Sequence, residues 1–224
     1  MAKKSVKNKS SDKSDSRVPT QKQIEEGLYF DFEGFGNNEF RKNLPPVLCG
    51  YRFGGYGPVS FAVFNEKFRW AAESDEIGQI EFIGGGEKMK QFLIDLIDRR
   101  TRGGKKIFYY SSHEKDEFDR RLGIQIRKRL RDVRKIMKKS IPSLKHGERT
   151  LINYCSEVGI PVPTNYGKGK VTQKFRKVRD YSATKSAWGK APSNIKRQWN
   201  LILEHNRFDV ESMYELLQKT INNG

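Results

Sequence analysis

Short apolar segments separated by turn-forming residues dominate the first half of the chain. Aromatic and branched side chains fill residues 28–35, 47–53, 59–64 and 105–110. Segments of this length and composition are typical of β-strands. A stretch rich in glycine and proline, 54–58, joins the second segment to the third as a turn. The pattern therefore predicts a three-stranded antiparallel meander followed by a further strand.

Apolar residues elsewhere recur at the spacing of one helical face. This spacing predicts helices over about 89–97, 114–122, 124–137, 149–160 and 192–222. Strands and helices that follow one another along the chain are typical of α/β domains. We therefore expect an α/β fold in which a mixed sheet, the meander plus parallel strands, is flanked by helices.

The amino-terminal segment differs from the rest of the chain. Residues 1–22 contain seven lysines or arginines and almost nothing to bury, which predicts a disordered basic tail. The 202 residues that follow, 23–224, fit one domain of medium size.

The formal net charge of +17 is concentrated in two further segments. Segment 124–145 carries nine basic residues and one acidic residue, and segment 166–199 carries ten and one. We interpret both as basic inserts that bind a polyanion, with nucleic acid the first candidate and an anionic membrane surface the second. The predicted contacts to the nucleic acid backbone come from Arg127, Arg131, Arg134, Lys135, Lys138, Lys168, Lys170, Lys174, Arg176, Lys177 and Arg179.

Aromatic residues are interleaved with the basic ones in the second insert. Tyr166, Phe175, Tyr181 and Trp188 are suited either to stacking on unpaired bases or to a small core of their own.

Cysteine content and hydropathy narrow the cellular setting. Cys49 and Cys155 form neither a disulfide framework nor a thiolate zinc site. No apolar run is long enough to span a bilayer, and the amino terminus lacks the apolar core of a signal peptide. We expect an intracellular protein, cytoplasmic or associated with the nucleoid or nucleus, with no membrane partner.

Two acidic residues interrupt the first apolar segment. Asp31 and Glu33 are two positions apart in a strand, so their side chains emerge on the same face. Neighbouring carboxylates repel each other unless a cation lies between them, and oxygen ligands suit Mg²⁺ or Mn²⁺. The alternative is an ordinary polar face turned toward water.

Two other acidic positions have a placement that favours function. Glu114 follows a predicted strand at the start of a helix, where α/β proteins place functional groups, although an acid there also complements the helix dipole. His205 and Asp209 lie four residues apart on the last helix and share a face, and the alternative is an ordinary surface pair.

Three stretches resemble the motifs of one nuclease superfamily. Phe30-Asp31-Phe32-Glu33 resembles the Asp-x-Glu motif of the DEDD, or DnaQ-like, ribonuclease H-like 3′→5′ exonucleases. His205 to Val210 resembles the third motif of the tyrosine branch, Tyr-Asn-x-x-Asp-Val, and Tyr110 to Glu114 resembles the second. The resemblance covers roughly 27–219 and is nearest to the RecB-associated ribonuclease H-like nucleases of bacteria, which tolerate a glutamate in the second motif.

Two residues depart from the motifs of the superfamily. The second-motif acid is Glu114 where aspartate is usual, and Asp116 or Asp119 would replace it if the helix began later. Position 205 holds histidine where the tyrosine branch has tyrosine. The chain thus combines the spacing of the tyrosine branch with a histidine.

The resemblance implies a ribonuclease H-like fold and catalysis by two Mg²⁺ or Mn²⁺ ions about 3.5–4 Å apart. In this reading Asp31 bridges both ions, Glu33 and Asp209 each complete one, and Glu114 acts on the second. His205 would orient or deprotonate the attacking water, because an unperturbed imidazole titrates near neutrality.

The expected activity is hydrolysis of phosphodiester bonds in DNA or RNA, with a 3′→5′ exonuclease as the leading hypothesis. One alternative is a structure-specific endonuclease of the same fold, which a wide basic surface would suit. Another alternative is a nucleic-acid-binding module whose catalytic site is weakened by the residues at 114 and 205.

Overall fold

A six-stranded mixed sheet forms the centre of the protein, seen here in a computed structural model that describes residues 17–35, 45–74, 79–100, 104–164, 166, 170–184 and 188–222. The strands are ordered β4-β3-β2-β1-β5-β6 across the sheet. Their bounds are β1 Leu28–Glu33, β2 Leu48–Phe53, β3 Ser60–Val63, β4 Ile80–Phe82, β5 Ile107–Tyr109 and β6 Leu130–Asp132.

The strand pairing confirms the predicted meander and parallel flank. Strands β1, β2 and β3 are antiparallel neighbours, while β5 runs parallel to β1. Two short edge strands were not predicted: β4 pairs parallel with β3, and β6 pairs parallel with β5. Each has three residues, which is too short to establish an alternating pattern in the sequence.

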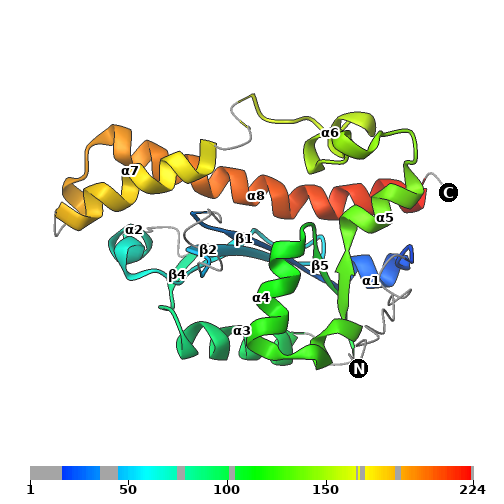
Figure 1. Ribbon diagram of the computed structural model, residues 1–224, viewed down its shortest axis with the longest axis horizontal. Helices are drawn as coiled ribbons and strands as arrows, with labels where there is room; N and C mark the ends of the chain where they lie inside the picture. Colours follow the sequence, from blue (N-terminus) through cyan, green and yellow to red (C-terminus); the bar gives the residue numbers. More distant parts are fainter. Residues whose placement is uncertain are drawn as a thin grey trace, which may run out of the picture.

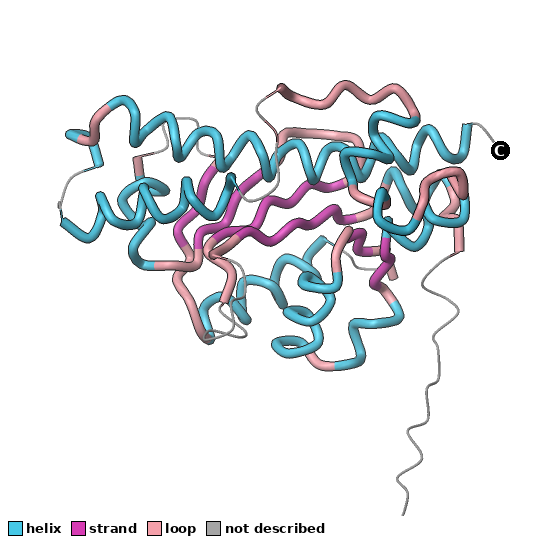
Figure 2. The backbone as a smooth tube through the Cα atoms, turned by 45° about the horizontal axis from the view of Figure 1, so that its top comes forward, coloured by secondary structure: helices cyan, strands magenta, loops and turns pink. Residues whose placement is uncertain are grey.

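The helices lie on both faces of this sheet, with the long α8 spanning one face and α3 and α4 covering the other (Figures 1 and 2). Helices α5, α6 and α7 lie on the same side as α8 (Figure 1). The α-helices of the described residues are α1 Gln21–Glu25, α2 Arg69–Glu73, α3 Glu87–Arg100, α4 Ser112–Leu122, α5 Val133–Ser140, α6 Leu151–Glu157, α7 Lys170–Thr184 and α8 Ser193–Asn222. This mixed sheet with helices on both sides is consistent with a ribonuclease H-like fold.

Side-chain alternation in the central strand β1 divides the core into two halves. Phe30 and Phe32 point toward α3 and α4, where they pack with Met89, Leu93 and Phe118. Tyr29 points to the opposite side, which α8 covers. Because side chains alternate along a strand, Asp31 and Glu33 lie on the α8 side with Tyr29.

The first basic segment contributes to the sheet and to the core. A single helix over 124–137 was predicted, and this prediction is wrong. A 3₁₀ turn at Ile124–Lys128 is followed by strand β6 and then by α5. Leu130 is buried from the strand and Val133 from the helix, so apolar residues that match one helical face are shared between two elements.

The second basic segment contains α7, which packs along α8 (Figure 1). Phe175 is fully buried between Phe35 and Phe68, with ring centroids 5.8 and 5.5 Å away. This aromatic residue therefore belongs to the main core. The Tyr181 hydroxyl donates to the backbone of Lys190 at 3.2 Å, and the side chain of Trp188 lies outside the described residues.

Most of the predicted tail, 1–22, lies outside the described residues. Helix α1 begins within its last two residues, where the Thr20 side chain accepts a hydrogen bond from the Gln23 N–H. Across the part of the chain that is described, no helix combines the length and the apolar character needed to cross a membrane.

Candidate functional site

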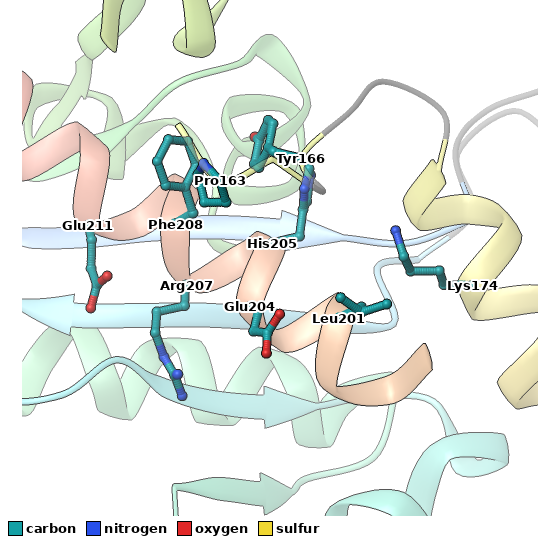
Figure 3. Close-up of a pocket in the computed structure, with 9 residues that line it drawn as sticks. All are labelled: Pro163, Tyr166, Lys174, Leu201, Glu204, His205, Arg207, Phe208 and Glu211. Carbon is teal, nitrogen blue, oxygen red and sulfur yellow. The ribbon is translucent and has the colours of Figure 1, made fainter. Parts of the chain in front are cut away.

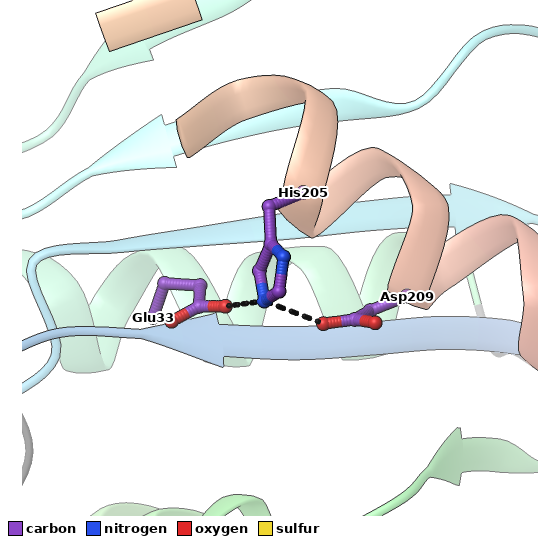
Figure 4. A group of neighbouring side chains, drawn as sticks. All are labelled: Glu33, His205 and Asp209. Atoms are coloured by element: carbon purple, nitrogen blue, oxygen red, sulfur yellow. Dashed lines mark ion pairs between the residues drawn. The ribbon is translucent and has the colours of Figure 1, made fainter. Parts of the chain in front are cut away.

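The last helix and the first strand bring three polar side chains together. Imidazole Nε2 of His205 lies 3.4 Å from Oε1 of Glu33 and 3.5 Å from Oδ2 of Asp209. Figure 4 shows the ring directed from α8 toward both carboxyl groups. Each of the three residues offers a ligand atom, and these atoms all lie within 4.8 Å of one another. The three residues could therefore hold a metal ion.

Asn206 fixes the first-strand acid against the last helix. This fully buried amide donates from Nδ2 to the Asp31 carboxylate at 2.5 Å and to the Asp31 backbone carbonyl at 3.2 Å. The close approach requires Gly50 on β2, because a Cβ there would lie 1.9 Å from Oδ1 of Asn206. Among the residues that the structure describes, Oδ1 has no hydrogen-bond partner, and both bonds of the side chain go to Asp31.

Glu114, in the first turn of α4, acts through its charge on Asp31, Glu33 and Asp209. It is 3% exposed, and its Oε2 accepts hydrogen bonds from the backbone N–H of Ser111 at 2.8 Å and from the Ser111 hydroxyl at 2.6 Å. This capping box stabilises the start of the helix. Glu114 therefore serves the helix terminus while its charge acts on the acids of β1 and α8.

Asp116 and Asp119, the two alternatives for the second-motif acid, differ from Glu114 in their surroundings. Asp119 forms a two-bond contact with Arg127, 2.8 Å for each bond, and a bond to Lys115 at 3.2 Å. Burial alone would raise the pKa of Asp119, but these cationic partners outweigh it and lower the pKa. Asp116 is exposed on α4. Of the three acids, Glu114 is the buried one.

The carboxyl groups of the cluster oppose one another's ionisation. Burial, followed by the charges of Asp209, Glu33 and Glu114, raises the pKa of Asp31. Burial and the charges of Asp209 and Glu114 raise the pKa of Glu33. The pKa of Asp209 is raised to about 7, chiefly by burial, with Glu114 adding to the effect. Such mutual repulsion is relieved when a cation binds among the groups.

The burial of His205 favours the neutral form of its imidazole. Burial, assisted by the positive charge of Lys174, lowers its pKa to about 4. The expectation of a side chain that titrates near neutrality therefore does not apply to this structure. A neutral ring is the form that ligates metals or accepts a proton, so His205 joins the candidate ligands, a role that the motif comparison did not give it.

Tyr166 is a further residue of the site, and the motifs gave no indication of it. Its hydroxyl donates to Oδ1 of Asp209. Its ring stacks on His205 with centroids 4.1 Å apart and an interplanar angle of 20°. Burial and the charge of Asp209 raise the pKa of Tyr166, so the hydroxyl stays protonated. Only the interleaving of aromatic and basic residues marked this position in the sequence.

A pocket of about 280 Å³ adjoins the acidic cluster and shares Tyr166 and His205 with it. Figure 3 shows the pocket along α8, with Phe208 close to Tyr166. It is lined by Pro163, Tyr166, Lys174, Leu201, Glu204, His205, Arg207, Phe208 and Glu211. The lining combines aromatic and apolar surface with two positive and two negative side chains.

The basic residues predicted to contact the nucleic acid backbone differ in the partners that they have within the protein. Arg127 is paired with Asp119, Lys135 lies 3.7 Å from Asp132, and Arg179 binds Asp180. Arg131 is half-buried and donates to the carbonyl oxygens of Lys128 and Leu130.

The other predicted contacts are more open or lie nearer the acids. The exposed members are Arg134, Lys138, Arg176 and Lys177. Lys174 lines the pocket, and its charge acts on both Glu33 and His205. Lys168 and the side chain of Lys170 lie outside the described residues.

The possible ligand group joins Glu33 on β1 to His205 and Asp209 on α8, and the charges of Asp31 and Glu114 act on its carboxyl groups. Oxygen and imidazole ligands in one buried group suit Mg²⁺, Mn²⁺ or a borderline ion such as Zn²⁺. Comparisons of the chain with models of known protein families, with curated proteins and with solved structures find no match.

Proposed function

We propose that this protein hydrolyses phosphodiester bonds of nucleic acid with the aid of bound Mg²⁺ or Mn²⁺. The observation that carries the proposal is the meeting of Glu33, His205 and Asp209 in a largely buried position, where the charges of Asp31 and Glu114 also act on the carboxyl groups. Burying such a group without a cation costs free energy, and the raised pKa values of Asp31, Glu33 and Asp209 express that cost.

The donor set fits divalent ions. Glu33, His205 and Asp209 would hold one ion, and Asp31 and Glu114 would supply ligands toward a second. Bound divalent ions polarise the scissile phosphate and stabilise the charge that develops on the leaving oxygen. The buried amide of Asn206 would keep the Asp31 carboxylate in place.

The remaining chemistry falls to side chains of this chain. Because burial lowers its pKa to about 4, His205 is a weak base, so beside the other ligands it would orient the attacking water and not take its proton. Lys174, whose charge acts on both Glu33 and His205, would contact a substrate phosphate. The exposed cations Arg134, Lys138, Arg176 and Lys177 would bind the backbone more remotely.

The mode of cleavage follows from the motif resemblance, which favours a 3′→5′ exonuclease. A 3′-end-labelled strand incubated with Mn²⁺ tests this directly. Immediate release of labelled mononucleotide supports an exonuclease, and a discrete internal product indicates an endonuclease. Binding without cleavage indicates a binding module and contradicts the proposal.

Asp31→Asn is the decisive variant, since the amide keeps the shape of the side chain and removes the charge. We expect it to abolish cleavage and to leave nucleic acid binding largely intact. Asp95→Asn on α3 is the matched control, because Asp95 also accepts a side-chain hydrogen bond, from Gln91 at 2.9 Å, on the opposite side of the sheet. Full activity in Asp31→Asn would refute the proposed mechanism.

A further inference from the structure

We infer that Tyr166 is a positioning residue of the cation site, supplied by the connection between α6 and α7. Its hydroxyl orients the Asp209 carboxylate, and its ring orients the His205 imidazole. The inference deepens the proposed function and rests on it, because it concerns the same ions.

The first line of support is the division of labour between the two oxygens of Asp209. Oδ1 accepts the hydrogen bond from the Tyr166 hydroxyl, whereas Oδ2 lies 3.5 Å from Nε2 of His205. A hydrogen bond to one oxygen fixes the rotation of the carboxylate and leaves the other oxygen directed at the ligand group. Outer partners of this kind orient the ligands of metal sites.

The second line of support is the aromatic packing around the imidazole. Tyr166 stacks nearly parallel to His205 at 4.1 Å, and Phe208 meets Tyr166 edge-on at 4.8 Å with an interplanar angle of 61°. The stack restricts rotation of the imidazole, so Nε2 remains directed at Glu33 and Asp209 (Figure 4). One side chain therefore restrains two of the three candidate ligands.

The third line of support is the way in which the backbone holds Tyr166. Its N–H donates to the carbonyl oxygen of Pro163 at 2.9 Å. Ile160, at the start of the connection, is buried, and its N–H donates to the carbonyl oxygen of Cys155 at 2.8 Å. These contacts anchor the connection to α6 on one side of the tyrosine. The restraint on the ligands is thus tied to the fold.

Two substitutions separate the hydroxyl from the ring. Tyr166→Phe removes only the hydrogen bond to Asp209, and Tyr166→Leu also removes the stack on His205. Tyr181→Phe is the matched control, since the Tyr181 hydroxyl donates to the backbone carbonyl of Lys190 and lies outside the cluster. Thermal denaturation of each variant verifies that it folds.

Calorimetric titration with Mn²⁺ alone provides a readout that does not depend on cleavage. We expect Tyr166→Phe to weaken Mn²⁺ affinity by about 10-fold or more, because the loss of an outer partner of a metal ligand typically has an effect of this size. Tyr166→Leu should also lower kcat at saturating Mn²⁺, because the histidine ring is then free to rotate. Tyr181→Phe should bind Mn²⁺ as the wild type does.

The outcomes distinguish this inference from the proposed function. If the wild type binds Mn²⁺ and cleaves, and Tyr166→Phe matches it, the positioning role is refuted while the nuclease assignment stands. Tighter Mn²⁺ binding by Tyr166→Phe also refutes it, because the hydroxyl would then compete with the ion. If the wild type binds no Mn²⁺, both proposals fail together.

Discussion

Removing the Asp209 carboxylate should stabilise the cation-free protein, and the size of the effect follows from its environment. The pKa of this group is raised from an ordinary 3.8 to about 7. Between these values the folded state binds a proton that the unfolded state has released, so stability falls as the pH rises from about 4 to 7. Above pH 7 the full cost is present. A factor of ten per pH unit corresponds to about 1.4 kcal/mol, so the upper limit is about 4 kcal/mol.

Asp209→Asn removes this cost and keeps the shape of the side chain. We expect the cation-free variant to be more stable than the wild type by about 2–4 kcal/mol at pH 8 and nearly equal to it at pH 4. For a chain of this size that corresponds to about 5–15 °C in Tm. Urea denaturation of both proteins in the presence of a chelator, from pH 4 to pH 8, measures the difference. Subtracting the two curves gives the effect of Asp209 together with the relief of Asp31 and Glu33, whose pKa values its charge raises.

Asp119→Asn is the matched control, with the opposite sign. The pKa of Asp119 is lowered by its bonds to Arg127 and Lys115, which outweigh its burial. Its contribution to stability is therefore present above the unfolded pKa and lost as the pH falls. This variant should be less stable than the wild type at pH 8, and the loss should be small because the Arg127 partner is exposed.

Added Mn²⁺ completes the test. It should raise the Tm of the wild type more at pH 8 than at pH 5, because the carboxyl groups must ionise before they ligate. The rise should be largely absent in Asp209→Asn. Destabilisation of that variant at pH 8 would refute the electrostatic reasoning, and an equal response to Mn²⁺ would remove Asp209 from the ligands.

Three further changes test other parts of the site. Gly50→Ala should lower the free energy of unfolding in urea by about 1–3 kcal/mol and weaken Mn²⁺ binding, because the new Cβ displaces the Asn206 amide from its hydrogen bonds. Gly147→Ala is the control, since a Cβ at Gly147 would meet no atom within 4 Å. His205 should contribute a rise of up to about 3 kcal/mol to the stability of the wild type between about pH 4 and pH 6.5, because its pKa is lower in the folded than in the unfolded state. His205→Gln should abolish this contribution. Identical pH–stability curves for the two proteins would contradict this. Changing both Arg176 and Lys177 on α7 to Ala should reduce the slope of log K against log salt concentration for nucleic acid binding by roughly 1–2. Cleavage at saturating substrate should be unchanged. An unaltered slope would place the binding surface elsewhere.

The long, strongly patterned elements were predictable from the sequence. The short apolar segments 28–35, 47–53 and 59–64 and the turn at 54–58 indicated β1 to β3, and the periodic apolar residues of α8 indicated a helix from about 192 to 222. The edge strands β4 and β6 were missed because each has three residues and gains its structure from pairing with a neighbour. In β6 and α5 the apolar positions coincidentally matched one helical period.

The sequence was also sufficient to predict which acidic residues belong to the candidate site. Spacing placed Asp31 beside Glu33 on a strand and His205 beside Asp209 on a helix, because strand and helix periodicity are local properties. Local patterns carry no information on the protonation of these groups. The lowered pKa of His205 and the raised pKa of Asp209 both arise from burial under elements distant in sequence.

By itself, then, the sequence determined which side chains share a face of β1 and of α8, since a few residues of backbone geometry suffice for that. The tertiary structure alone decided that Asn206 donates a hydrogen bond to Asp31 and that Gly50 leaves space for the Asn206 amide. It also decided that Tyr166 contacts Asp209, 43 positions away in the chain. Those contacts depend on how helices pack against a sheet. Packing is set by the whole core, so no short pattern of residues encodes it.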